Sequence, residues 1–195
     1  MTAGSLSLQN AVEGVLAVGV LLSEFAMLRL LLVEAVVRVY GVQSLLVAGF
    51  TAAVAWITSN PDLYVLAVLT FAIKVVAIPI IVTTILRRLG GEDRVPATVP
   101  VPRSLLIAAG LAALGFAVVT RLAPGLRAGS GLGVGTAMVL IGFFMMAARG
   151  NAVAQLVAFL SLENGVFLAS VSLAPGLPLL VAVLLLLDIL IPAVA

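Results

Sequence analysis

Three ionisable side chains interrupt long apolar stretches of this sequence: Lys74, Glu163 and Asp188. Each lies near the middle of its stretch, about a dozen residues from the nearest polar segment. A charged side chain at the centre of a membrane-spanning helix costs about 2.5–3.5 kcal/mol on insertion scales, so each of the three needs a reason to be there. Two carboxyl groups and one amine at a similar depth can form a hydrogen-bonded row.

The chemistry that fits such a row is proton handling. Burial raises the pKa of a carboxyl group and lowers that of an amine, which brings both toward neutral pH, where protons can move. A nearby opposite charge has the reverse effect, so making and breaking such a pair can gate a relay. The residues leave a second interpretation open, in which Lys74 and one acid form a permanent buried pair that only holds helices together.

Spacing along the chain places the two acids at one depth. Glu163 precedes the turn sequence LAPGLP by about as many residues as Asp188 follows it. At a rise of 1.5 Å per residue, a helical hairpin puts both roughly 18 Å from the turn. We therefore predict a proton or ion relay formed by Lys74, Glu163 and Asp188.

Further polar residues are candidates for the same relay. Glu13 and Glu24 lie 11 residues apart in the first apolar stretch, so a helix presents them on one face about 16 Å apart. Glu24 also lies within about one turn of Arg29 and can pair with it instead. Asn164 follows Glu163 directly and can hydrogen-bond to it.

The elements that position these residues are predicted from composition. The chain is 64% hydrophobic and 9% charged, whereas soluble domains carry about 25% charged residues. A helix needs about 20 apolar residues to cross about 30 Å of hydrocarbon, and the alternation typical of a membrane β-barrel is missing. Seven runs have about the required length: 11–30, 41–57, 63–86, 104–119, 131–148, 151–174 and 176–195. We predict an all-α, polytopic membrane protein with about seven transmembrane helices.

The segment RRLGGEDRVPATVPVPR, residues 87–103, is the longest non-apolar one. Its paired glycines and three prolines predict a surface linker. The predicted organisation is a three-helix part (1–90), a linker (91–103) and a four-helix part (104–195).

The residue inventory excludes several functions. The chain has no cysteine and no histidine, which excludes disulfides, thiolate or imidazole metal sites and the usual haem, iron–sulfur and zinc centres within it. We expect no cofactor, no catalytic residue and no nucleic-acid partner. The start, MTAGSLSLQN, lacks a basic region, so no cleaved signal peptide is predicted. The apolar end, LDILIPAVA, leaves open a further tail.

Charge placement predicts the orientation. Seven arginines fall near three turns that share one side of the membrane: Arg29, Arg38, Arg87, Arg88, Arg94, Arg103 and Arg149. Arg121 and Arg127 fall on the other side, together with Asp62. Because cytoplasmic loops carry the excess of arginine and lysine, we predict a cell-membrane protein with its N-terminus outside and the 87–103 loop in the cytoplasm.

Several glycine, proline and glutamine residues support weaker predictions about how the helices bend and pack. Pro79 is expected to kink its helix and free a carbonyl near Lys74. The glycines of GLGVG, residues 131–135, are typical of close helix packing. Gln43 and Gln155 are expected mainly to hydrogen-bond between helices.

Three segments carry a resemblance: VYGVQSLLV, FAIKVVAIPIIVTTILRR and RGNAVAQLVAFLSLENGVFLA. In this order and spacing, the chain resembles the component E (HyfE-type) membrane subunit of hydrogenase-4 and related formate hydrogenlyase complexes, over nearly its whole length. The resemblance implies a non-redox subunit of a membrane arm related to respiratory complex I. From about Gly135 to residue 195 the chain also resembles the NuoK-type subunit of that complex. That resemblance implies proton transfer near Glu163 and Asp188, with Glu163 about one turn from the family's acid and Asp188 where glutamate is usual.

The leading hypothesis is therefore a membrane-arm subunit of a hydrogenase-type complex, contributing to proton or cation translocation and to assembly. The resemblance implies antiporter-like membrane subunits as partners in the bilayer and a peripheral hydrogenase-type redox arm on the cytoplasmic side, near the 87–103 loop and Arg149. A small stand-alone cation/proton antiporter or secondary transporter component is the alternative, although one Trp and two Tyr make a poor substrate lining. A pure scaffold remains a third possibility.

Overall fold

The computed structural model describes residues 3–89, 95, 98–122 and 131–173. This part of the chain is helical, and no strand occurs in it. The elements are α1 (Ala3–Arg29), α2 (Val33–Thr58), α3 (Pro61–Thr70), the π-helix η1 (Phe71–Ala77), α4 (Ile78–Leu89), α5 (Val101–Leu122), α6 (Gly131–Ala148) and α7 (Ala152–Leu173).

Six helical spans in the described residues are long and apolar enough to cross a membrane. The third of them, Pro61–Arg88, runs through α3, η1 and α4 without a break. The all-helical membrane class predicted from composition is confirmed at this level. The seventh predicted run, 176–195, lies outside the described residues.

The first turn differs from its prediction. The second helix begins at Val33, about two turns before the predicted run at Gly41, and Arg38 lies inside α2 instead of in a loop. No glycine or proline occurs between Gly19 and Gly41, so local sequence gives no signal for where the first helix ends. The break falls at Leu32, whose backbone is extended.

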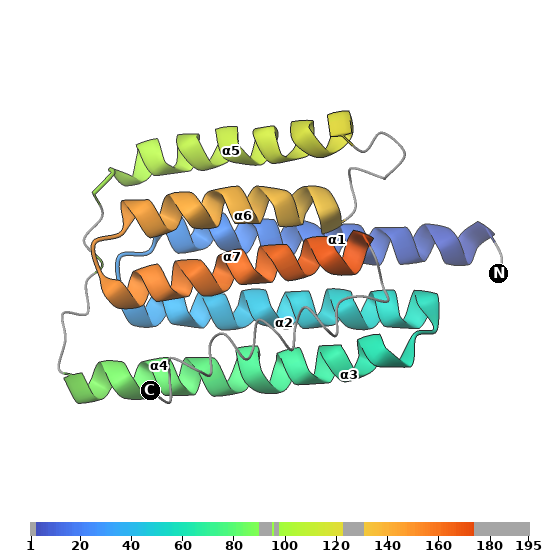
Figure 1. The fold of residues 1–195 in the computed structure, drawn as a ribbon, viewed down its shortest axis with the longest axis horizontal. Helices are drawn as coiled ribbons and strands as arrows, with labels where there is room; N and C mark the ends of the chain where they lie inside the picture. Colours follow the sequence, from blue (N-terminus) through green and yellow to red (C-terminus); the bar gives the residue numbers. More distant parts are fainter. Residues whose placement is uncertain (1–2, 90–94, 96–97, 123–130, 174–195) are drawn as a thin grey trace.

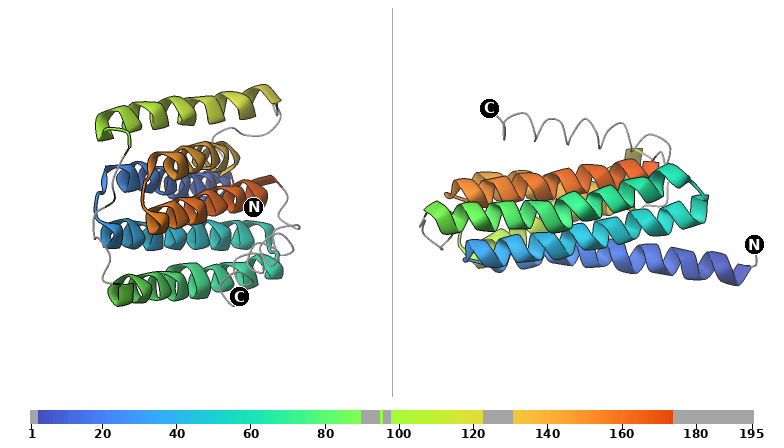
Figure 2. Two further views of the ribbon diagram at one scale, coloured as in Figure 1. Left: turned by 60° about the vertical axis from the view of Figure 1, so that its left-hand side comes forward. Right: turned by 90° about the horizontal axis from the view of Figure 1, so that it is seen from below.

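The helices lie side by side along one long axis (Figure 1). The α5 helix forms one edge of the bundle and the α3–α4 span forms the other, with α1, α2, α6 and α7 between them (Figures 1 and 2). Helix α2 packs against α7 and α1 packs against α6. Residues from before and after the 87–103 segment therefore share one core.

The closest packing is between α6 and α7, where glycines allow the two backbones to meet. A Cβ built at Gly135 would lie 2.5 Å from the carbonyl oxygen of Gly165, and one at Gly142 would lie 2.7 Å from Cβ of Leu162. The GLGVG sequence therefore packs as predicted. This contact fixes the position of α7, the helix that carries Glu163, along the axis of the bundle.

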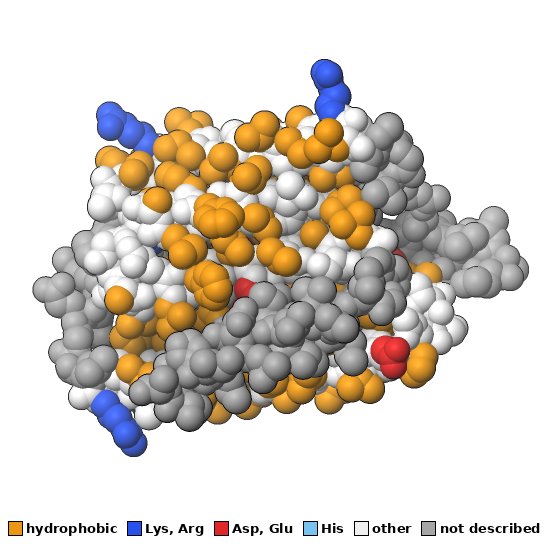
Figure 3. Space-filling view, in the orientation of Figure 1, with side chains coloured by type: hydrophobic (Ala, Val, Ile, Leu, Met, Phe, Trp, Pro, Cys, Tyr) orange, Lys and Arg blue, Asp and Glu red, His pale blue; other side chains and the backbone are white. Residues whose placement is uncertain are grey.

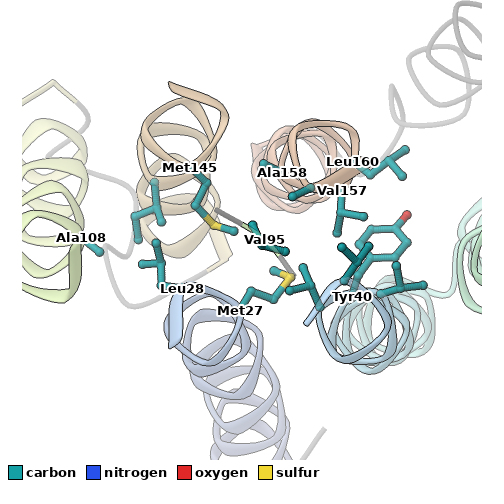
Figure 4. Close-up of a cluster of buried hydrophobic side chains, with 14 of the residues drawn as sticks. Met27, Leu28, Tyr40, Val95, Ala108, Met145, Val157, Ala158 and Leu160 are labelled. Carbon is teal, nitrogen blue, oxygen red and sulfur yellow. The ribbon is translucent and has the colours of Figure 1, made fainter. Parts of the chain in front are cut away.

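One core cluster joins α1, α2, α6 and α7, as Figure 4 shows for Met27, Tyr40, Met145 and Val157. Val95 from the predicted surface linker is also part of it and is only 3% exposed. Its backbone N–H donates to the carbonyl of Leu31 over 2.7 Å. The linker is therefore not purely a surface segment, because one apolar side chain inserts between the helix ends.

The exterior is apolar, the reverse of a soluble protein. Hydrophobic side chains are spread over the described part of the visible face, and the basic side chains seen there lie near its ends (Figure 3). Large side chains such as Trp56 and Leu106, 71% and 75% exposed, point outward. This distribution fits a lipid-facing surface with charges near the two interfaces.

Candidate functional site

Lys74 lies in the π-helical segment η1, in the middle of its span, and is 5% exposed. The π segment ends just before Pro79, which has no N–H and cannot donate the usual hydrogen bond to the carbonyl four residues earlier. The N–H of Ile78 instead donates to Ile73, five residues back. The predicted disturbance around Pro79 thus takes the form of a π-helix, a form frequently found at functional sites.

The Lys74 ammonium points at α7. Its Nζ lies 3.0 Å from Oε1 of Glu163, and the two side chains are 7% and 3% exposed. Nζ also donates to Oδ1 of Asn164 over 3.1 Å. The ring of Phe167, one turn further along α7, lies 5.9 Å from Nζ. Three α7 side chains therefore surround a single buried cation.

Asn164 extends this contact to α2. Its amide nitrogen donates to Oε1 of Gln43 over 3.2 Å and to Oγ of Ser44 over 3.0 Å. All three side chains are fully buried. Asn164 uses both ends of its amide group and so bridges the ammonium of Lys74 to two consecutive residues of α2.

Ser161, one turn before Asn164 on α7, continues the chain to α1. Its hydroxyl lies 2.8 Å from Oε1 of Gln43 and makes a short contact with Oε1 of Glu24. Both Ser161 and Glu24 are fully buried. A continuous hydrogen-bonded chain therefore runs from Glu163 through Lys74, Asn164, Gln43 and Ser161 to Glu24, across four helices. We call these six residues the polar chain.

Several buried polar atoms have no hydrogen-bonding partner among the described residues. They are Oε2 of Glu24, Oη of Tyr40, Nε2 of Gln43 and Oε2 of Glu163. Three of the four belong to the polar chain.

The structure places the predicted site residues as follows. Lys74, Glu163, Asn164 and Glu24 come together in the polar chain. Glu13 is half-buried and lies about three turns from Glu24 toward the beginning of α1, so α1 keeps the two apart by about 16 Å. Asp188 lies outside the described residues, and its predicted depth relative to Glu163 is untested.

Three members of the site were missed or given a lesser role. Gln43 was expected mainly to hydrogen-bond between helices, and Ser44 and Ser161 were not predicted at all. Ser161 and Asn164 lie three residues apart, a spacing that puts both on one face of a helix with Glu163 beside them. That spacing was the available signal. Gln155 does join helix to turn, because its side chain donates to the carbonyl of Arg149 over 2.7 Å.

Arg149 has a structural use that its sequence position did not suggest. Its guanidinium donates to the carbonyls of Met27, Leu28 and Leu30 over 3.1, 2.8 and 3.2 Å. The residue is 4% exposed, and its guanidinium caps the end of α1. Burial lowers the pKa of this guanidinium from its usual value.

The same end of the bundle gathers three turns. The Thr98 backbone N–H donates to the carbonyl of Ala148 over 3.1 Å, and Val95 contacts Leu31. Residues near 30, Val95, Thr98 and the turn near 149 therefore share one side, as the sequence predicted. Among the described residues, no three Asp or Glu side chains gather closely enough to hold a metal ion.

Comparison with known proteins gives one partial similarity. The chain is 40% identical over 90 residues to the protein named "Uncharacterized protein Rv0085" from Mycobacterium tuberculosis. The match covers 45% of this chain and 40% of that protein, so the chain matches less than half the length of its relative. No protein-family model matches the chain, and no solved structure matches it.

Proposed function

We propose that this chain is a non-redox membrane-arm subunit of a complex I-related hydrogenase or formate hydrogenlyase-type complex, in which the polar chain takes part in moving protons or cations. The single observation that supports the proposal most is the buried Lys74–Glu163 pair, extended by hydrogen bonds to Glu24. The resemblance of the segments around Lys74 and Glu163 to component E subunits supplies the kind of complex.

The composition of the polar chain favours a proton or ion relay rather than a permanent ion pair that only holds helices together. A structural contact of that kind needs one ion pair, but here a second acid, two amides and hydroxyl groups are also buried. Ionisable groups within membrane spans are expensive, and they commonly mark ion or proton pathways. The polar chain also joins four helices, because it runs from Glu163 on α7 through Lys74 and Gln43 to Glu24 on α1.

The partners follow from the same proposal. Antiporter-like membrane subunits would dock on the apolar exterior within the bilayer, and the redox arm would dock at the cytoplasmic end of the bundle. The exposed Arg87, Arg88 and Arg103 at the helix ends are available to that arm, whereas the buried Arg149 is not. The proposed location is the cell membrane, with the N-terminus outside.

The test is charge translocation by the assembled complex in sealed vesicles, comparing wild type with Glu163→Gln. Loss of translocation in an intact complex is the expected result, because the variant removes the titratable partner of Lys74. Glu34→Gln is the matched control, since Glu34 is an exposed acid at the beginning of α2. Assembly is followed on native gels.

Normal translocation by an intact Glu163→Gln complex would assign the pair a structural role. If Glu163→Gln prevents assembly, Asn164→Leu provides the second variant, because it interrupts the chain without removing a charge. Wild-type rates in both variants would contradict the proposal.

A further inference from the structure

The direction of each hydrogen bond in the polar chain can be worked out from the chemistry of its members. An ammonium group has donors only, so Lys74 must face an acceptor, and Asn164 presents Oδ1 to it at 3.1 Å. The amide nitrogen of Asn164 is thereby turned toward α2. The hydroxyl of Ser44 accepts from that nitrogen at 3.0 Å, which holds the same orientation.

The orientation of Asn164 determines that of Gln43. The Asn164 nitrogen donates to Gln43 over 3.2 Å, so Gln43 must present its oxygen there. Ser161 lies 2.8 Å from the same oxygen. A carbonyl oxygen only accepts, so the hydroxyl hydrogen of Ser161 belongs in this contact.

A serine hydroxyl has one hydrogen to donate. Ser161 contacts Oε1 of Glu24 as well as the oxygen of Gln43. With the hydroxyl hydrogen directed at Gln43, the hydrogen between Ser161 and Glu24 has to come from Glu24. That carboxyl group can donate only when it is protonated.

The charge balance of the cluster leads to the same result independently. One lysine and two glutamates are buried in the polar chain. If all three were ionised, the cluster would carry an uncompensated negative charge in the bundle interior, which is costly. The ion pair at 3.0 Å joins Glu163 to Lys74, so Glu24 is the acid left without a cation.

We propose that Glu24 is the residue of the polar chain that holds a proton at rest, as a neutral carboxylic acid that donates to Ser161. Two oppositely directed hydrogen-bond chains, one from Lys74 and one from Glu24, then meet at the oxygen of Gln43. That this proton is one the protein moves rests on the proposed function. The protonation of Glu24 itself does not.

Charged groups on the neighbouring elements do not alter this assignment. Helix α6, which packs on α1, has no charged residue. Helix α5 contributes Arg103 and Arg121, and α2 contributes Glu34 and Arg38, all four exposed near helix ends. The buried titratable residue of α2 is Tyr40, which is neutral at physiological pH, and α7 contributes Glu163.

The test is infrared spectroscopy of the purified full chain in lipid nanodiscs at neutral pH. A neutral carboxylic acid has a carbonyl stretch above the amide I band, and this stretch disappears on ionisation and shifts in heavy water. We expect such a band in wild type, its loss in Glu24→Gln and its retention in Glu34→Gln, which removes an exposed acid and leaves the charge of the polar chain unchanged. A band that survives in Glu24→Gln would overturn the assignment.

A second variant, Ser161→Ala, tests the assignment in case Glu24→Gln does not fold. Ser161→Ala removes the group to which Glu24 donates but keeps the acid buried, so the band is expected to remain and shift in frequency. A band unmoved by Ser161→Ala would overturn the assignment. The readout is independent of transport: if Glu163→Gln and Asn164→Leu both leave translocation intact while the band assignment holds, the proposed function fails and Glu24 still holds the proton.

Discussion

Lys74 Nζ and Glu163 Oε1 lie 3.0 Å apart in the middle of the helix bundle, with almost none of either side chain exposed. The contact joins the π-helical segment η1 to α7, two elements that lie far apart in the sequence. Lys74 makes a further contact, because its ammonium also donates to Asn164, and Asn164 in turn donates to Gln43 on α2. The pair is therefore one end of a longer chain that reaches Glu24.

Removing one partner of this pair is expected to lower the free energy of unfolding much more than removing both partners. Lys74→Met leaves Glu163 buried without its cation, which should lower the free energy of unfolding by about 3–5 kcal/mol. The double variant Lys74→Met with Glu163→Leu buries no charge at that point and should lose much less. The measurement is detergent-induced unfolding of the purified chain in mixed micelles, analysed as a double-mutant cycle.

Equal losses in the single and the double variant would contradict this expectation, because the loss would then come from packing of the lysine side chain. Ser170→Ala on α7 is a suitable control. Within the described residues, the Ser170 hydroxyl bonds to the carbonyl of Val166 in its own helix, so little change is expected.

The sequence indicates some parts of this site and not others. Lys74, Glu163 and Glu24 could be predicted because a charge within an apolar run is costly, whatever the packing. Ser161 could not be distinguished in this way, since serines in membrane helices often bond to their own backbone, as Ser172 does here. Its role depends on which helix lies opposite, and that is a property of packing.

The presence of the described helical spans could be predicted, because polar groups are costly in hydrocarbon. The exact breaks between helices could not. Hydrocarbon thickness sets the length of each span, so the six described spans follow from composition. The break at Leu32 and the burial of Val95 depend on contacts between distant segments. Pro79 predicted a local distortion of the helix near Lys74, but not that it would take the form of a π-helix.

The glycine contact between α6 and α7 predicts opposite effects at two glycines. Gly135→Ala puts a methyl group 2.5 Å from a carbonyl oxygen of α7, so the helices must move apart, at a cost of about 1–3 kcal/mol. Gly110→Ala on α5 meets nothing within 4 Å and should gain up to about 1 kcal/mol from helix propensity. Unfolding in mixed micelles measures both, and a similar effect of the two substitutions would show that the close α6–α7 contact is not formed.

Arg149 is expected to hold the end of α1 in place. Arg149→Gln removes a cation from the negative end of that helix and breaks contacts with three carbonyls, so a loss of about 2 kcal/mol is expected. Hydrogen exchange should quicken in the last turn of α1. Arg103→Gln, an exposed residue in the first turn of α5, should leave that exchange unchanged.

This contribution should not vary with pH across the neutral range. Burial lowers the pKa of Arg149, so the folded protein binds this proton less tightly than the unfolded chain does. Because the pKa is lower in the folded state, the stability contributed by Arg149 rises as the pH approaches the range in which this residue titrates. Arginine titrates far above neutral pH, so both states stay protonated there and the wild-type minus Arg149→Gln difference should be flat. A difference that changes between mildly acidic and mildly basic buffer would contradict this assignment.

The proposed orientation can be tested with single cysteines, because the chain has none of its own. Pro100, just before α5, and Asp62, at the start of α3, are both exposed and lie at opposite ends of the bundle. We expect Pro100→Cys to react with a membrane-impermeant maleimide only in inside-out vesicles. Asp62→Cys should react only in intact spheroplasts.

The reverse pattern would place the ends of α4 and α5 outside the cell, with their exposed arginines Arg87, Arg88 and Arg103, against the positive-inside rule. It would also remove those arginines as a docking surface for a cytoplasmic redox arm. The polar chain would remain, because its contacts do not depend on which side of the membrane is the cytoplasm. Labelling therefore tests the orientation and the docking side separately from the relay.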